Sequence, residues 1–179
     1  MKKIVIPGLF AALITPVAFA SNCHGSSDGS AVHGDHHGMH ARHHQAGSPV
    51  GRPGDANSAT RTIEVHAYDS MQFKFSEPLN FVDGEVVTFV VTNHGQIAHE
   101  LSIGNHAEHE KHREMMLRMA GMDHDHDDGQ TLTVAPGQTG RLTWQFQSGD
   151  DLLFACNIPG HFEAGMHQAG QIAKNGRHH

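Results

Sequence analysis

The sequence has no excess of positive charge, few cysteines and no apolar run long enough to span a membrane. Lys and Arg number 12 against 19 Asp and Glu, which gives a formal charge of −7. A negative chain of this kind argues against nucleic acid as a partner. The two cysteines allow one disulfide at most. The most apolar stretch, residues 4–17, is short and is interrupted by Pro7, Gly8 and Pro16, so it is poorly suited to crossing a bilayer.

Residues 1–20 have the three parts of a cleavable signal peptide. Lys2 and Lys3 form a charged start, the apolar stretch follows, and residues 18–20 (Ala-Phe-Ala) match a small-residue cleavage site. A membrane anchor is the alternative, and the short, interrupted apolar stretch disfavours it. Cleavage removes both lysines and takes the formal charge from −7 to −9. We therefore expect an exported, periplasmic protein that has no membrane attachment after cleavage.

Residues 21–60 are dominated by Ser, Gly, Asp and His and hold almost no large apolar side chain. Such a segment buries too little surface to offset the entropy of ordering, which predicts a disordered leader. The chain contains 19 His and 8 Met, and both residue types are soft or borderline metal ligands. Histidine-rich tracts bind metals, with a merely solvated linker as the alternative. The candidate copper ligands of the leader are His33, His36, His37, His40, His43 and His44.

From residue 61 onward the pattern is that of short β-strands. Apolar and polar residues alternate in several segments, β-branched residues dominate others, and turn signals such as Asp83-Gly84 and Pro136-Gly137 separate them. No alternation of strands with helices is present, so we expect an all-β Greek-key β-sandwich or barrel over residues 61–179. The expected strands are residues 62–68, 71–75, 85–92, 97–103, 131–134, 140–147, 151–155 and 168–174.

Residues 105–122 break this pattern. The segment has no β-branched residue and no proline, consists largely of helix formers, and is followed by an acidic, histidine-containing loop that extends to residue 128. Gly121 is a plausible helix stop. The sequence therefore predicts a helical insertion at about 105–128 within the β-domain.

Three potential metal ligands follow one another at regular spacing near the C-terminus. Cys156 is followed by His161 after four residues and by Met166 after four more, so one loop can place all three side chains around one metal. Thiolate and imidazole with a weak axial thioether form the ligand set of blue-copper sites, and Met is not among the usual ligands of zinc. Because this chemistry needs a free thiolate at Cys156, we expect no disulfide with Cys23.

The remaining ligand is expected to be a histidine from another segment. His99 is the best candidate, because it lies at the start of a predicted strand that follows a β-branched one. His94, which precedes Gly95 in a predicted turn, is its rival. The predicted copper centre is thus His99, Cys156, His161 and Met166.

These residues resemble the cupredoxin family of type 1 blue or green copper proteins. The similarity covers roughly residues 61–175 and rests on VVTFVVTN at 86–93, His99-Glu100, and the Cys156/His161/Met166 loop. The resemblance implies that Cys156 is the thiolate responsible for an intense colour and that Met166 tunes the reduction potential. The His-rich leader and the Met/His helix further resemble the CopI type of periplasmic copper-resistance cupredoxin.

The helical insertion contains a second group of potential copper ligands. Methionines recur at positions i, i+4 and i+7, which lie on one helical face, and thioethers select Cu(I). The alternative is that this methionine stripe packs the helix onto the sandwich, because Met fills irregular gaps. The candidate ligands of this second, labile site are His109, His112, Met115, Met119 and Met122.

Several classes of copper enzyme are disfavoured by the neighbours of Cys156. Multicopper oxidases and copper nitrite reductases need a histidine beside this cysteine, whereas Ala155 and Asn157 flank it here. A dinuclear electron-transfer centre needs two cysteines in the loop, and this loop has one. No nucleophile–base pair and no paired carboxylates accompany the site.

Three functions remain for a protein with this ligand set. The first is copper tolerance, with copper ions as the partner and binding or oxidation of excess copper as the role. The second is soluble electron transfer to a redox partner protein, for which Pro159, Gly160 and Phe162 would form the docking surface. The third is a cuprous oxidase, which would make the protein an enzyme. The soft ligands of the leader and helix favour tolerance, because a carrier needs only the copper centre and a docking surface.

Overall fold

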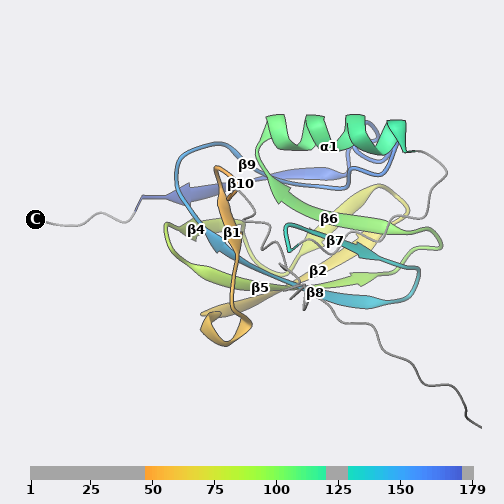
Figure 1. Cartoon of the computed structure of the whole chain (residues 1–179). Helices are drawn as coiled ribbons and strands as arrows, with labels where there is room; N and C mark the ends of the chain where they lie inside the picture. The colour runs from red at the N-terminus through yellow and green to blue at the C-terminus, as the bar shows by residue number, and fades with distance from the viewer. Residues whose placement is uncertain (1–46, 120–128, 175–179) are drawn as a thin grey trace, which may run out of the picture. The chain divides into compact units, whose positions relative to one another are not determined.

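The computed structural model describes residues 47–119 and 129–174, which form a two-sheet β-sandwich with one α-helix (Figure 1). The first sheet has the strand order β1-β8-β5-β2-β3, and the second has the order β4-β10-β9-β6-β7. The expectation of an all-β fold with a helical insertion is confirmed. The strands are β1 (Gly51–Pro53), β2 (Arg61–Tyr68), β3 (Gln72–Phe75), β4 (Asn80–Val82), β5 (Val86–Asn93), β6 (His99–Gly104), β7 (Thr131–Val134), β8 (Thr139–Phe146), β9 (Leu152–Ala155) and β10 (His167–Ala173).

The core between the sheets is aromatic. Strand β2 alternates buried and exposed residues, so it presents Ile63, Val65 and Ala67 to the core and polar residues to solvent. The rings of Phe81 and Phe146 stack with centroids 3.9 Å apart. Strand β9 is buried along its whole length. Cys156, which directly follows β9, is also fully buried.

The folded domain begins earlier than the boundary expected at residue 61. Strand β1 pairs antiparallel with β8, and Val50 just before it is fully buried. Gly51 has φ 144°, and any side chain there would collide with the carbonyl of Gln145. Strand β1 is too short to carry an alternating pattern, and its place depends on pairing with β8, about 90 residues later in the chain. The 3₁₀ turn Ala56–Ser58 follows it. The expected signal peptide (1–20) and the leader up to residue 46 lie outside the described residues.

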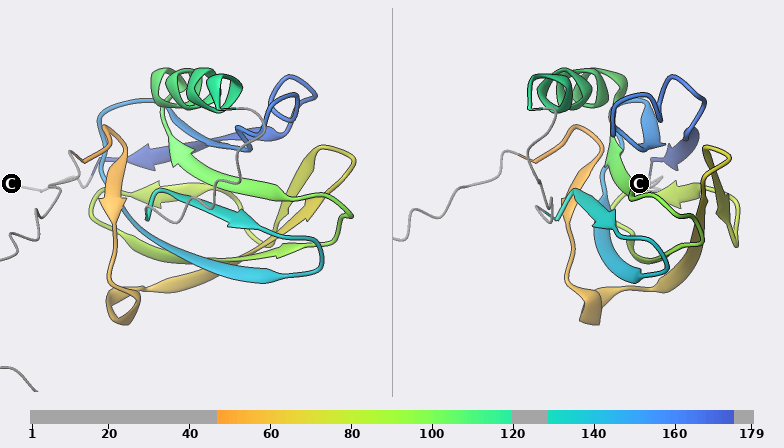
Figure 2. Two further views of the ribbon diagram at one scale, coloured as in Figure 1. Left: turned by 45° about the vertical axis from the view of Figure 1, so that its right-hand side comes forward. Right: turned by 90° about the vertical axis from the view of Figure 1, so that its right-hand side faces the viewer.

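Helix α1 (His106–Arg118) occupies the predicted insertion and begins at a complete capping box. The Asn105 side chain accepts a hydrogen bond from the Glu108 N–H, and Glu108 accepts one from the Asn105 N–H, each at 2.9 Å. Ser48 donates a further hydrogen bond of 2.7 Å to Glu108, which ties the helix start to the segment before β1. Both views in Figure 2 place α1 beside the loop that joins β9 to β10.

Replacement of Val50 by alanine tests whether the segment before residue 61 belongs to the folded domain. We expect Val50→Ala to lower the free energy of unfolding by about 1–3 kcal/mol, because a buried side chain is lost and a cavity remains. Val82→Ala, at a valine that is 45% exposed, should cost about 0.5 kcal/mol or less. Urea unfolding of the mature chain measures both. Equal costs for the two variants would contradict the integration of the N-terminal segment.

Candidate metal centre

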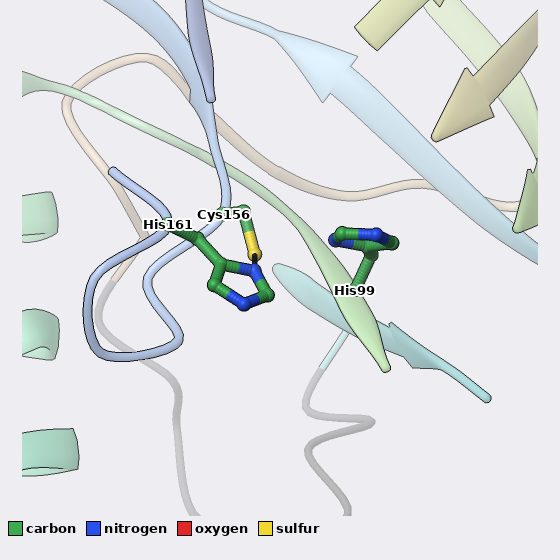
Figure 3. Close-up of side chains that lie close together, drawn as sticks. All are labelled: His99, Cys156 and His161. Atoms are coloured by element: carbon green, nitrogen blue, oxygen red, sulfur yellow. Dashed lines mark hydrogen bonds between the residues drawn. The ribbon is translucent and has the colours of Figure 1, made fainter. Parts of the chain in front are cut away.

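Three of the predicted ligands meet at one end of the sandwich. His99 begins β6, Cys156 directly follows β9, and His161 lies in the loop between β9 and β10. One ligand atom from each residue lies within 4.8 Å of the other two, and all three residues are buried. The Cys156 Sγ and the His161 Nδ1 are 3.2 Å apart, and the ring centroids of His99 and His161 are 5.1 Å apart. Figure 3 shows the three side chains turned toward a common point.

The β9–β10 loop is closed by its own backbone. The Cys156 N–H donates to the Met166 carbonyl, and the Met166 N–H donates to the His161 carbonyl, each at 3.0 Å. Gly160 and Gly165 have φ values of 87° and 101°, which glycine adopts without the clash of a Cβ. Met166 is fully buried at the base of this loop. The backbone hydrogen bonds of the loop thus hold the main chain of Met166 next to that of Cys156 and of His161.

Burial keeps the thiol and the imidazole neutral in the metal-free protein. Loss of solvation raises the pKa of Cys156 to about 12, although the Glu100 N–H donates a hydrogen bond of 3.3 Å to its sulfur. Burial also lowers the pKa of His161, and nearby His99 lowers it further. Metal ligation by Cys156 must therefore displace a proton, whereas ligation by a neutral imidazole does not.

His99 presents the clearest sign that this cluster fits a metal. Its Nε2 lies 3.0 Å from Asp69 Oδ1, so Nε2 carries the proton and Nδ1 keeps its lone pair. That Nδ1 is buried and finds no hydrogen-bond partner among the described residues. An unpartnered buried nitrogen is costly, and a metal shared with Cys156 and His161 would satisfy it.

Asp69 is the residue that sequence reasoning missed. It lies in the turn between β2 and β3, 30 residues before His99, and no spacing connects the two. The Gln96 N–H donates to the Asp69 carboxylate at 2.7 Å and lowers its pKa, and the hydrogen bond with His99 acts in the same direction. Asp69 is therefore a carboxylate that orients a candidate ligand, as the outer partners of metal-bound histidines do.

The rival ligand His94 lies elsewhere. It is exposed and its Nε2 is 2.8 Å from the Nδ1 of His66 on β2. The structure thus groups His99, and not His94, with Cys156 and His161.

The two candidate histidines of α1, His109 and His112, take part in a polar network inside the protein. His109 is buried, with Nε2 3.0 Å from the Leu153 carbonyl and Nδ1 3.3 Å from Asn157 Oδ1. Burial lowers the pKa of His109. His112 Nδ1 lies 3.3 Å from Asn157 Nδ2 and 3.7 Å from Glu100 Oε1. Because Asn157 follows Cys156 and Glu100 follows His99, this buried polar network connects the helix to the metal cluster.

A cavity of about 600 Å³ separates α1 from the edge of the second sheet. Its lining includes His109, His112, Met115 and Met119, so four of the five candidates for the second site share one cavity. The buried residue of the helix is His109 rather than a methionine. Met115 is 38% exposed. Met122 and the six leader histidines (His33, His36, His37, His40, His43 and His44) lie outside the described residues.

Three curated relatives match most of the chain, and all are named copper-resistant cuproprotein CopI. The relative from Vibrio cholerae serotype O1 is 40% identical over 166 residues, which is 93% of this chain and 96% of the relative. The relative from Rubrivivax gelatinosus is 41% identical and covers 90% and 88% of the two chains. The relative from Pseudomonas aeruginosa is 39% identical and covers 70% and 82%. No family model matches the chain.

Solved structures of auracyanins share the fold. The auracyanin of Roseiflexus castenholzii superposes with a TM-score of 0.51 at 19% identity and covers 64% of this chain and 98% of its own. Auracyanin B gives a TM-score of 0.52 at 19% identity, with coverage of 72% and 99%. Auracyanins are cupredoxins, so this likeness identifies the sandwich as a cupredoxin fold. Within residues 47–119 and 129–174, the structure has no helix long and apolar enough to cross a membrane.

The orienting role of Asp69 can be tested first in the metal-free protein and then by copper binding. We expect His99 to be protonated at Nε2 in the metal-free protein and to mix both tautomers in Asp69→Ala, as read from imidazole ¹⁵N shifts. Copper affinity should fall by about 10–100-fold. Asp69→Asn, whose amide oxygen still accepts from Nε2, should keep the tautomer. Asp55→Ala, an exposed carboxylate elsewhere, is the control. An unchanged tautomer in Asp69→Ala would contradict the assignment.

The raised pKa of Cys156 predicts proton release on metal binding. Between pH 7 and 8 the thiol is protonated, because its pKa of about 12 lies far above this range. Loading the cluster with Cu(II) should therefore release about one proton more from the mature chain than from Cys156→Ala. Titration in weakly buffered solution with a pH indicator measures the difference. Equal proton release by the two proteins would show that Cys156 is not a ligand.

Proposed function

The chain belongs to the CopI family of copper-resistance cupredoxins, and on that premise we propose that it is an exported copper-tolerance protein with one mononuclear type 1 copper centre. His99 and His161 supply the imidazoles, Cys156 the thiolate and Met166 the axial thioether. The observation that carries this proposal is the buried Cys–His–His cluster, with its unpartnered His99 nitrogen. This set of soft and borderline ligands is the one that blue-copper sites use.

Each residue of the centre has a distinct task in this proposal. When bound, the copper supplies one-electron chemistry by cycling between Cu(I) and Cu(II). Asp69 holds the tautomer that frees the His99 nitrogen, and the closed β9–β10 loop holds His161 near Cys156. The Glu100 N–H directed at the sulfur stabilises the thiolate form. His99, Cys156 and Met166 are themselves buried, which keeps water away from the site.

We extend the proposal to a second, labile copper site on α1. The cavity lined by His112, Met115 and Met119 is open to solvent at the partly exposed Met115. A thioether pair with an imidazole selects Cu(I). His109 acts here through its hydrogen bonds to Leu153 and Asn157, which anchor the helix. The leader histidines and Met122 stay as additional candidate ligands, and residues 1–20 as the expected export signal to the periplasm.

The alternative of a soluble electron carrier is less well supported, because α1 covers part of the expected docking surface. The Arg113 guanidinium lies 3.8 Å from the ring centroid of Phe162, and His167 stacks on the same ring with centroids 4.5 Å apart. Arg113 also pairs with Glu163 at 3.5 Å. Phe162 is thus half-buried by contacts within the protein, whereas Pro159 and Gly160 stay exposed. A cuprous oxidase activity would need the α1 site to pass an electron to the centre and from there to an external acceptor.

The type 1 centre predicts a visible absorption band from thiolate-to-copper charge transfer. The mature chain loaded with Cu(II) should show the band, and Cys156→Ala should lack it. Cys23→Ala is the matched control and should keep the band at full intensity. Absence of the band from the parent protein would overturn the proposed centre and leave only a histidine-rich metal-binding protein.

The α1 site predicts Cu(I) binding beyond the type 1 centre. The double variant Met115→Leu/Met119→Leu keeps apolar bulk but removes both thioethers, so it should bind about one Cu(I) fewer per chain. Met116→Leu, at the adjacent methionine, is the control and should bind as the parent does. Copper counts after equilibration with a Cu(I)-specific chelator give the comparison. An unchanged count in the double variant would show that these methionines serve only to line the cavity.

A further inference from the structure

Two histidines outside the candidate centre lie in direct contact on the outer face of the first sheet. His66 belongs to β2, and His94 comes immediately after β5. The His66 Nδ1 and the His94 Nε2 are 2.8 Å apart, with ring centroids 5.0 Å apart and planes inclined by 44°. His94 is exposed and His66 is half-buried, so the pair is open to solvent on one side.

The sheet itself brings the two rings together. Strands β2 and β5 run parallel with His66 opposite Thr92, and the His94 N–H continues the ladder by donating to the Ala67 carbonyl at 2.9 Å. Tyr68, which lies on the same side of β2 as His66, stacks on the His94 ring with centroids 5.1 Å apart and planes inclined by 16°. Backbone pairing and stacking therefore place both imidazoles before any ligand arrives, which lowers the entropy cost of chelation.

The separation of the two nitrogens suits a single metal ion. Two imidazole nitrogens that bind one ion at about 2.0 Å and at right angles lie about 2.8 Å from each other. In the metal-free protein one ring donates its N–H to the lone pair of the other. For both nitrogens to bind one ion, the donating imidazole must shift this proton to its other ring nitrogen through solvent, and both rings must turn so that the two lone pairs face the ion. Tetragonal coordination by nitrogen and oxygen is the preference of Cu(II).

We propose that His66 and His94 form a surface chelate for Cu(II), with water in the remaining positions. The choice of Cu(II) rests on the proposed function, whereas the geometry of the chelate is independent of it. Lys74 faces His66 across the β2–β3 register, and its ammonium lies 5.2 Å from the Tyr68 ring centroid. This nearby positive charge opposes tight binding and makes the site exchangeable. Asp69, which orients His99, directly follows Tyr68 in the chain. The proposed chelate therefore lies next to a residue that supports the candidate copper centre.

Paramagnetic broadening of backbone amide signals locates Cu(II) on the full mature chain. Cys156→Ala serves as the parent background, because it removes the thiolate centre. During a Cu(II) titration to saturation, the amide signals of Tyr68 and Thr92 should broaden. His66→Gln and His94→Gln should each raise the copper concentration needed for this broadening by about 100-fold, because one imidazole alone loses the chelate effect. His106→Gln, at an exposed histidine that begins α1, is the matched control and should leave the broadening unchanged.

The outcomes separate this site from the proposed type 1 centre. If either single variant needed only the same copper concentration as its Cys156→Ala parent for this broadening, the binding would be monodentate and adventitious. That result would overturn the chelate. No broadening of Tyr68 and Thr92 at saturation would overturn it as well. With Cys156 present, the thiolate-to-copper band should persist in both His→Gln variants. Absence of that band from the mature chain without any substitution would count against the proposed function but would leave the chelate standing.

Discussion

The antiparallel pairing of β6 with β9 is the constraint on which the candidate centre depends. Ser102 lies opposite Ala155 in this pair, so the start of β6 and the end of β9 come to the same end of the sandwich. His99 thereby arrives beside Cys156, and the Glu100 N–H reaches the cysteine sulfur at 3.3 Å. A slip of one residue would turn every side chain of β6 to the opposite face. Helix α1, which follows β6, depends on the same pairing for its contact with β9.

The chemistry of the centre follows from burial with incomplete hydrogen bonding. Cys156 is held as a neutral thiol, and one nitrogen of His99 is buried with no partner among the described residues. The unpartnered nitrogen is costly in the metal-free protein, since its lone pair is withdrawn from water, whereas a buried neutral thiol carries no such penalty. In the proposed centre a bound metal would give that nitrogen a partner and would ligate the thiolate, so the binding free energy would offset the cost of assembling the site. Asp69, held by the Gln96 N–H, makes this arrangement specific by fixing one tautomer.

Helix α1 is an addition to the cupredoxin sandwich, and its contacts reach the residues around the candidate centre. Its capping box and the bond from Ser48 fix its start, and His109 anchors it to β9 through the Leu153 carbonyl. Arg113 reaches over Phe162 of the β9–β10 loop. The helix therefore covers part of the Phe162 ring while Pro159 and Gly160 stay exposed, and it brings a cavity lined by two methionines close to the residues that flank the candidate centre. Copper handling explains both features better than electron transfer between proteins does.

Local patterns in the sequence predicted eight of the ten strands, the helical insertion and the Cys156/His161/Met166 loop, because alternation and spacing within one segment are set by neighbours along the chain. The three-residue strands β1 and β4 are too short to carry such a pattern. The choice of His99 over His94 also followed from its place at a strand start. Only the tertiary structure decided the roles of Asp69, Asn157 and the His66–His94 pair, and the early start of the domain at Val50. Each of these depends on contacts between strands far apart in sequence, where pairing register, not local composition, decides which side chains meet.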